Sequence, residues 1–297
     1  MKRTMVLFRW SLLVFLTGVV ISVPAQADKL KAYVSIVPQQ YFVEKIGRDL
    51  VDVSIMVQPG ASPATYEPKP RQMAELASTD VYFAIGVPFE KTWLDKIAAV
   101  NPRMLVIHTE SGIEKIPMAR HGHLEDDENN GRRQAHQTLK DPHIWLSPPL
   151  VMIQARNILA ALTEIDQRNR SIYEENYKQF ILELVNLDME IRDLFLKGGY
   201  FMVVHPSWGY FAKAYGLEQI PIEIEGKEPK PTQLRNLIKL AREKKIRTLF
   251  AQPEFSTKSA RLIAREINGQ VVLISPLAKN WAENLKDTAR KIKKAMR

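Results

Sequence analysis

The sequence contains no cysteine in its 297 residues. This absence excludes disulfide bonds, thiolate metal ligands, cysteine nucleophiles and a lipid attached to an N-terminal cysteine. The phosphate loops G-x-G-x-x-G and G-x-x-x-x-G-K are absent as well, and so is the H-E-x-x-H spacing of a metal-dependent hydrolase. We therefore expect a protein that is not an enzyme.

Apolar runs long enough to cross a membrane are lacking too, since a span needs ~20 apolar residues. The run Ser11–Val23 is shorter than this, follows a basic start, and precedes the small-residue cleavage site Ala25-Gln26-Ala27. This order predicts a cleavable signal peptide over residues 1–27. We expect the mature protein to be periplasmic, without a lipid anchor.

Acidic residues are outnumbered, with 33 Asp and Glu against 42 Lys and Arg and a net charge of +9. Lys2, Arg3 and Arg9 of the signal peptide contribute to this excess. The other basic residues are scattered along helical patterns and are not grouped with aromatic residues. We expect a solvated basic surface and no nucleic-acid partner.

Short apolar runs alternate with helical patterns and favour an α/β fold. We expect two lobes, residues 28–165 and 198–297, each with a mostly parallel sheet flanked by helices. One long rigid linker helix over residues 166–197 joins them and would measure ~45 Å. Strands are expected near residues 32–37, 51–57, 81–85, 104–107, 201–204, 217–222, 248–251 and 271–274, and the last helix over residues 286–297.

An apolar stripe at steps of three and four residues runs along the linker helix. It could seed a coiled-coil dimer, but the globular surroundings favour a single helix packed against both lobes, and hence a monomer. The stripe consists of Tyr173, Tyr177, Phe180, Leu184, Leu187, Ile191 and Leu194.

A polar loop over residues 117–140 interrupts the α/β pattern. It contains His121, His123 and His136 beside an acidic run at residues 125–128. Two interpretations stay open, a flexible loop that collects metal ions weakly or a solvated insertion that happens to contain histidines.

Two histidines stand in similar surroundings, one in each half of the chain. His143 follows Asp141-Pro142 and precedes a tryptophan, and His205 precedes Pro206-Ser207-Trp208. We expect both at strand-to-helix junctions, with their imidazoles converging on one transition-metal ion between the lobes. Asp141 either orients His143 as an outer carboxylate or simply forms a turn with Pro142.

Several segments taken in order carry a family resemblance: residues 59–68, 86–94, 141–145, 205–211, 225–229 and 275–277. They resemble the zinc and manganese solute-binding proteins of ABC importers, the ZnuA-like family, over essentially the whole mature chain. The resemblance implies two α/β lobes joined by one long helix, with a metal ion, zinc in the first place, bound in the cleft. It also implies delivery to an ABC permease and its ATPase subunit.

The resemblance implies four metal ligands, and two of them are missing here. His143 and His205 match two ligands, but Ala64 stands in place of a histidine and Ser275 in place of an acidic residue. A methyl group cannot coordinate, and a neutral hydroxyl is a poor replacement for a carboxylate. The candidate substitutes are Glu67, Glu225, Glu254, His121, His123 and His136.

The incomplete ligand set leaves the cargo open. Two strong nitrogen ligands would also suit copper or nickel, and the resemblance allows manganese. We expect metal binding that is retained but altered. The alternative is a degenerate member with weak or no metal binding, acting on another ligand or as a binding or adhesion module.

Overall fold

The computed structural model of the chain describes residues 28–119, 139–224 and 226–296. The predicted signal peptide, the loop residues His121, His123 and His136, and Glu225 lie outside these ranges. Within the described residues, no helix combines the length and the apolar character needed to cross a membrane.

The N-terminal lobe contains a parallel sheet with the strand order β2-β1-β3-β4. All residues of the inner strand β3 are buried, as expected of a parallel sheet covered by helices on both faces. The elements are β1 (Leu30–Val34), α1 (Val37–Gly47), β2 (Val51–Ile55), α2 (Pro70–Leu76), β3 (Val81–Ala84), α3 (Glu90–Val100) and β4 (Leu105–His108).

The C-terminal lobe repeats this topology in the parallel sheet β6-β5-β7-β8. In each lobe the strand order reverses beside the first strand, between β1 and β3 and between β5 and β7. Ligands of such sheets bind outside the carboxyl ends of the strands at this reversal. The elements are β5 (Gly199–Val203), α6 (Gly209–Ala214), β6 (Leu217–Pro221), α7 (Pro231–Glu243), β7 (Thr248–Ala251), α8 (Lys258–Glu266), β8 (Gln270–Leu273) and α9 (Trp281–Ala295).

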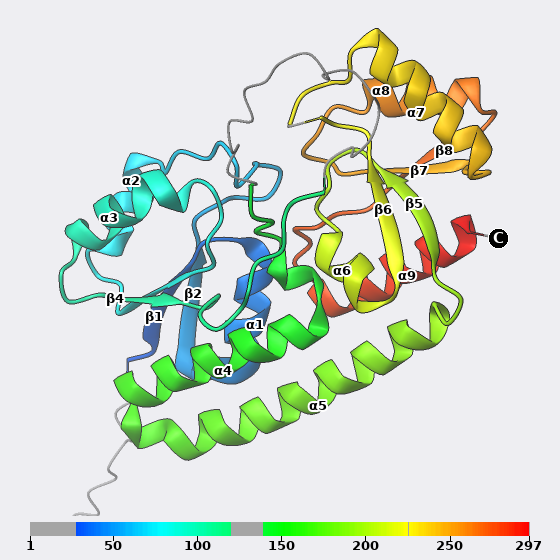
Figure 1. Cartoon of the computed structure of the whole chain (residues 1–297). Helices are drawn as coiled ribbons and strands as arrows, with labels where there is room; N and C mark the ends of the chain where they lie inside the picture. Colours follow the sequence, from blue (N-terminus) through cyan, green and yellow to red (C-terminus); the bar gives the residue numbers. More distant parts are fainter. Residues whose placement is uncertain (1–27, 120–138, 225, 297) are drawn as a thin grey trace, which may run out of the picture.

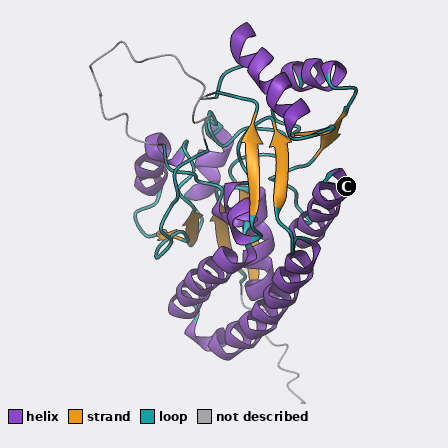
Figure 2. Cartoon of the chain, turned by 45° about the vertical axis from the view of Figure 1, so that its right-hand side comes forward, coloured by secondary structure: helices purple, strands orange, loops and turns teal. Residues whose placement is uncertain are grey.

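Helix α4 (Pro148–Ile165) packs against the N-terminal lobe and runs antiparallel to the long helix α5 (Arg170–Leu194), which runs beneath both lobes and connects them (Figure 1). Helix α5 packs against α1 and α4 on one side of the molecule and against α9 on the other. In the turned view the strands lie between helices (Figure 2). The predicted fold, two α/β lobes joined by one long helix, is confirmed, whereas the predicted domain boundaries stay predictions.

Two helices differ in length from the sequence-based expectation. Helix α5 has 25 residues and measures about 38 Å, because Asp166 ends α4 and a 3-10 turn over Gln167–Asn169 comes first. The last helix begins at Trp281 rather than at residue 286. Trp281 is buried, so the apolar face of α9 begins earlier in the chain than the helical pattern of the sequence indicated.

Candidate metal-binding site

His143 belongs to the first lobe and lies before the short 3-10 helix Ile144–Leu146, which leads into α4. The expectation of a strand-to-helix junction is wrong here. Strand β4 ends at His108, and a long connection separates it from His143 because the polar loop is inserted between them. His143 itself is only 8% exposed.

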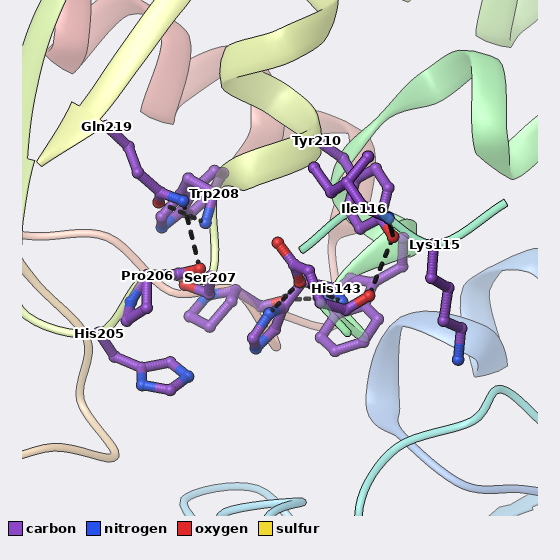
Figure 3. A network of polar contacts seen from close by, with 12 residues as sticks. Lys115, Ile116, His143, His205, Pro206, Ser207, Trp208, Tyr210 and Gln219 are labelled. Carbon is purple, nitrogen blue, oxygen red and sulfur yellow. Dashed lines mark hydrogen bonds and ion pairs between the residues drawn. The ribbon is translucent and has the colours of Figure 1, made fainter. Parts of the chain in front are cut away.

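A buried carboxylate orients His143. Asp141 Oδ1 accepts a hydrogen bond from the backbone N–H of His143 (2.9 Å) and lies 2.7 Å from its Nδ1. The Tyr210 hydroxyl donates to the Asp141 carbonyl and accepts from the Ile116 N–H, at 2.9 and 3.1 Å (Figure 3). Asp141 therefore orients His143, the first of the two roles that the sequence left open for it.

His205 follows strand β5 and precedes α6, as expected. Its Nδ1 lies 2.8 Å from Glu223 Oε2, and its ring stacks on Phe255 with centroids 4.3 Å apart and planes 10° from parallel. The buried amide of Gln252 accepts from the His205 N–H and donates to its carbonyl, at 3.2 and 2.6 Å. Backbone and ring of His205 are thus both held in place.

Sequence reasoning missed Glu223 and Phe255. A signal existed for Glu223, because it comes just after β6 and β6 pairs in parallel with β5. Parallel neighbours end at the same edge of a sheet, so a carboxylate after β6 lies close to a histidine after β5. Phe255 follows β7, the other parallel neighbour of β5, and could have been found in the same way.

Both imidazoles are arranged to offer a lone pair at Nε2. An ionised carboxylate only accepts hydrogen bonds, so the neutral rings carry their proton on Nδ1, facing Asp141 and Glu223. Burial lowers the pKa of His143; Asp141 opposes this effect and the neighbouring His205 adds to it. His143 therefore resists protonation, the state in which imidazole cannot bind a metal.

The two imidazoles lie close together, one from each lobe (Figure 3). Their ring centroids are 5.3 Å apart, with planes at 73°. With nitrogen–metal distances of ~2.0–2.1 Å and a tetrahedral angle, two ligating rings would have centroids about 5 Å apart. The geometry is compatible with one shared ion.

A cavity of about 340 Å³ contains both histidines and Glu254 in its lining. Glu254 Oε2 is buried and has no hydrogen-bond partner. Burial raises the pKa of Glu254, and the nearby His205 partly offsets this rise. Glu254 thus shares the cavity lining with the two histidines and has an unpaired buried carboxylate oxygen, and it was among the predicted substitutes.

The other predicted positions are placed differently. Ala64 is exposed and lines the cavity. Glu67 is also exposed but is not among the lining residues. Ser275 Oγ accepts from the Leu277 N–H at 3.2 Å, and the residues after it, Pro276 and Leu277, reach the cavity wall. Across the described ranges no three histidine, aspartate or glutamate side chains come together in a metal-binding cluster.

The lobes are tied together directly behind the site. Trp145 Nε1 donates to the Pro276 carbonyl (2.7 Å) and Trp281 Nε1 donates to the Trp145 carbonyl (2.8 Å). The Trp145 ring also packs against His143 at 5.2 Å between centroids. These two hydrogen bonds hold the C-terminal lobe against the segment of the N-terminal lobe that contains His143.

Comparisons with known proteins agree with this arrangement. A crystal structure of ZnuA superposes with a TM-score of 0.84 and 44% identity, covering 91% of this chain and 100% of that chain. The high-affinity zinc uptake system protein ZnuA of Bacillus subtilis (strain 168) is 28% identical, over 86% of this chain and 81% of its own. Iron-binding protein YfeA of Yersinia pestis is 25% identical, over 82% of this chain and 76% of its own.

The family model described as zinc-uptake complex component A, periplasmic, matches residues 33–295. Members of this family are solute-binding components of transport and not enzymes, which confirms the expectation of a protein without catalytic activity. The chain belongs to the ZnuA family of periplasmic metal-binding, solute-binding proteins.

Proposed function

We propose that the chain is the metal-binding subunit of an ABC importer and that it holds a zinc ion between its lobes through His143 and His205. The observation that carries this proposal is the convergence of two imidazoles in one cavity, with ring centroids 5.3 Å apart. Each ring is backed by a carboxylate at Nδ1. Carboxylate–histidine–metal arrangements of this kind orient metal ligands in proteins and raise their basicity.

The ligand set of this site is incomplete compared with the family pattern, because Ala64 and Ser275 occupy two ligand positions. Glu254 is the substitute that we propose, and its support is that it lines the cavity with an unpaired carboxylate oxygen. A nearby dication would favour its ionised form. Two imidazoles, one carboxylate and one water would complete a four-coordinate zinc site.

Zinc is the proposed cargo because neutral imidazole suits it and because two of the relatives are named for zinc uptake or as ZnuA. The relative from Yersinia pestis is named for iron and one from Streptococcus mitis for manganese, so both metals belong in the same measurement. Copper and nickel belong there too, because imidazole ligands suit them. The subunit would act as a periplasmic monomer without a lipid anchor, after removal of residues 1–27. It would hand the ion to a permease and its ATPase.

Calorimetric titration of metal-stripped protein over residues 28–297 tests this function. The parent is expected to bind zinc, and the double variant His143→Ala/His205→Ala is expected to lose this binding. His108→Ala is the matched control, because His108 is a half-exposed histidine hydrogen-bonded to Glu110 and is not in the cavity wall. Equal zinc affinity in parent and double variant would favour the degenerate alternative.

A further inference from the structure

The cavity beside the histidines is much larger than a metal ion requires. Its volume is about 340 Å³, whereas one water takes a share of only ~30 Å³ in the liquid. Small-molecule sites begin at ~300 Å³. An ion with two or three waters would therefore leave most of this space without a partner.

The walls of the cavity are mostly apolar and offer few donor atoms. Glu223 is already engaged by His205, so among the described lining residues the titratable groups left for a ligand are His143, His205 and Glu254. Of the two positions that the family resemblance assigns to the missing ligands, Ala64 lines the cavity; Ser275 does not, although the next two residues, Pro276 and Leu277, do. The open coordination positions of a bound ion thus face apolar surface and free volume.

We infer that the cleft takes the divalent cation as a complex with a small organic chelator, whose own donor atoms fill the positions left open by Ala64 and Ser275. This inference rests on the proposed function, because His143 and His205 supply the remaining two donors. It differs from the site proposed above in that donor atoms of the chelator take the positions of Glu254 and the water. The apolar wall, which includes Pro63, Val87 and Leu277, then contacts the carbon skeleton of the chelator. Burial of that skeleton contributes affinity that a hydrated ion could not.

Charge restricts the chelator to a class. Asp141 and Glu223, which back the imidazoles, already balance the two positive charges of a cation. A chelator with several negative charges would place excess negative charge beside Glu254, which is costly in a buried site. The class that fits is a small amino acid, a neutral zwitterion in solution, which releases its ammonium proton to the solvent and binds the cation as a monoanion through its amine nitrogen and its carboxylate. Its N–H group donates to the unpaired Glu254 Oε2.

Equilibrium dialysis of the metal-stripped protein with isotopically labelled L-histidine, with and without zinc, tests this inference. We expect one histidine retained per protein when zinc is present and none without zinc. Histidine should raise the apparent zinc affinity at least tenfold, whereas a site for the bare ion would lose apparent affinity because histidine competes for zinc. Citrate, a trianionic chelator, is expected to compete only.

A pair of variants locates the chelator. Ala64→Phe places a ring in the cavity next to the open coordination positions and is expected to reduce the ratio of retained histidine to bound zinc at least tenfold. Ala64→Ser changes the same position without filling the space and is expected to keep the ratio of the parent. Histidine retained equally by the Ala64→Phe variant, or by the His143→Ala/His205→Ala variant, would overturn the inference.

Titration with zinc alone separates the two proposals. Tight binding of zinc alone, with no histidine retained, would overturn the chelator and leave the proposed function intact. Loss of that binding in the triple variant His121→Ala/His123→Ala/His136→Ala would assign the missing donors to the loop, which also overturns the chelator. No zinc binding with or without histidine would refute both proposals.

Discussion

At the scale of single residues, the site depends on carboxylates that are not themselves the proposed ligands. Asp141 and Glu223 each lie at hydrogen-bond distance from the Nδ1 of a histidine that lines the cavity. Such partners fix the tautomer and the ring orientation, and their loss typically weakens metal binding by ~10–100-fold. Substitution of Asp141 or Glu223 therefore tests whether the imidazoles bind the ion while leaving both histidines unchanged.

The variant Glu223→Gln is expected to lower zinc affinity about tenfold or more. The amide keeps the shape of the side chain but removes the negative charge beside His205 Nδ1, which would help to balance the charge of a bound cation. Glu218→Gln is the matched control, because Glu218 is an exposed residue of β6, the strand that precedes Glu223. Competition with a fluorescent zinc chelator measures both. If Glu223→Gln binds zinc with the same affinity as the parent, His205 does not bind the ion.

The sequence identified the two histidines because each stands in a distinctive local motif. It did not identify Glu223 or Phe255, because their contacts with His205 join residues 18 and 50 positions apart, after separate strands of one sheet. The candidate Glu67, chosen for its proximity in sequence, stays a prediction. Glu67 stands near Ala64 in the chain, yet it is exposed and outside the cavity wall. Local motifs predict ligands better than they predict ligand partners.

At the scale of elements, most strands lie within two residues of their expected positions. Strand β7, residues Thr248–Ala251, matches its expected range. This success has a physical reason, since buried parallel strands are short continuous apolar runs that contrast with the amphipathic helices between them. The position of His143 could not be predicted in this way. The connection that leads to it has no periodicity, so its path depends on tertiary contacts such as Tyr210 with Asp141.

Helix α6 approaches the carboxylate behind His143 so closely that only glycine fits at its first residue. A Cβ on Gly209 would lie 2.5 Å from Asp141 Oδ2 and 3.2 Å from Gln219 Nε2. Glycine is the residue that permits such close approaches of the backbone. The C-terminal lobe therefore helps to position the histidine of the N-terminal lobe.

The variant Gly209→Ala is expected to displace Asp141 or α6, to cost ~1–3 kcal/mol of stability and to weaken zinc binding through His143. Lys213→Ala changes an exposed residue of the same helix and is expected to leave both quantities within error of the parent. Urea unfolding measures the stability, and chelator competition measures zinc affinity. A stable variant with unchanged zinc affinity would show that Asp141 does not need its observed position.

At the scale of the whole molecule, the two lobes form a continuous core. Buried residues of both lobes and of α5 belong to one apolar cluster. Trp281 of α9 packs edge-on against Phe42 of α1, with ring centroids 5.1 Å apart. Two indole hydrogen bonds, Trp145 to Pro276 and Trp281 to Trp145, cross between the lobes beside the histidines. The distance between the two imidazoles is thus set by the packing of the lobes.

The variant Trp281→Phe tests whether the lobe contact sets the geometry of the site. It keeps an aromatic ring but leaves the buried Trp145 carbonyl without the 2.8 Å indole bond, a loss of ~1–3 kcal/mol. We expect lower stability in urea and weaker zinc binding, because the histidines come from different lobes.

Trp93→Phe on α3 is the control, since Trp93 is half-buried in the N-terminal lobe and contacts Lys96 rather than the other lobe. It should keep the zinc affinity of the parent. If Trp281→Phe loses stability but binds zinc as the parent does, the two imidazoles do not depend on the lobe contact for their separation.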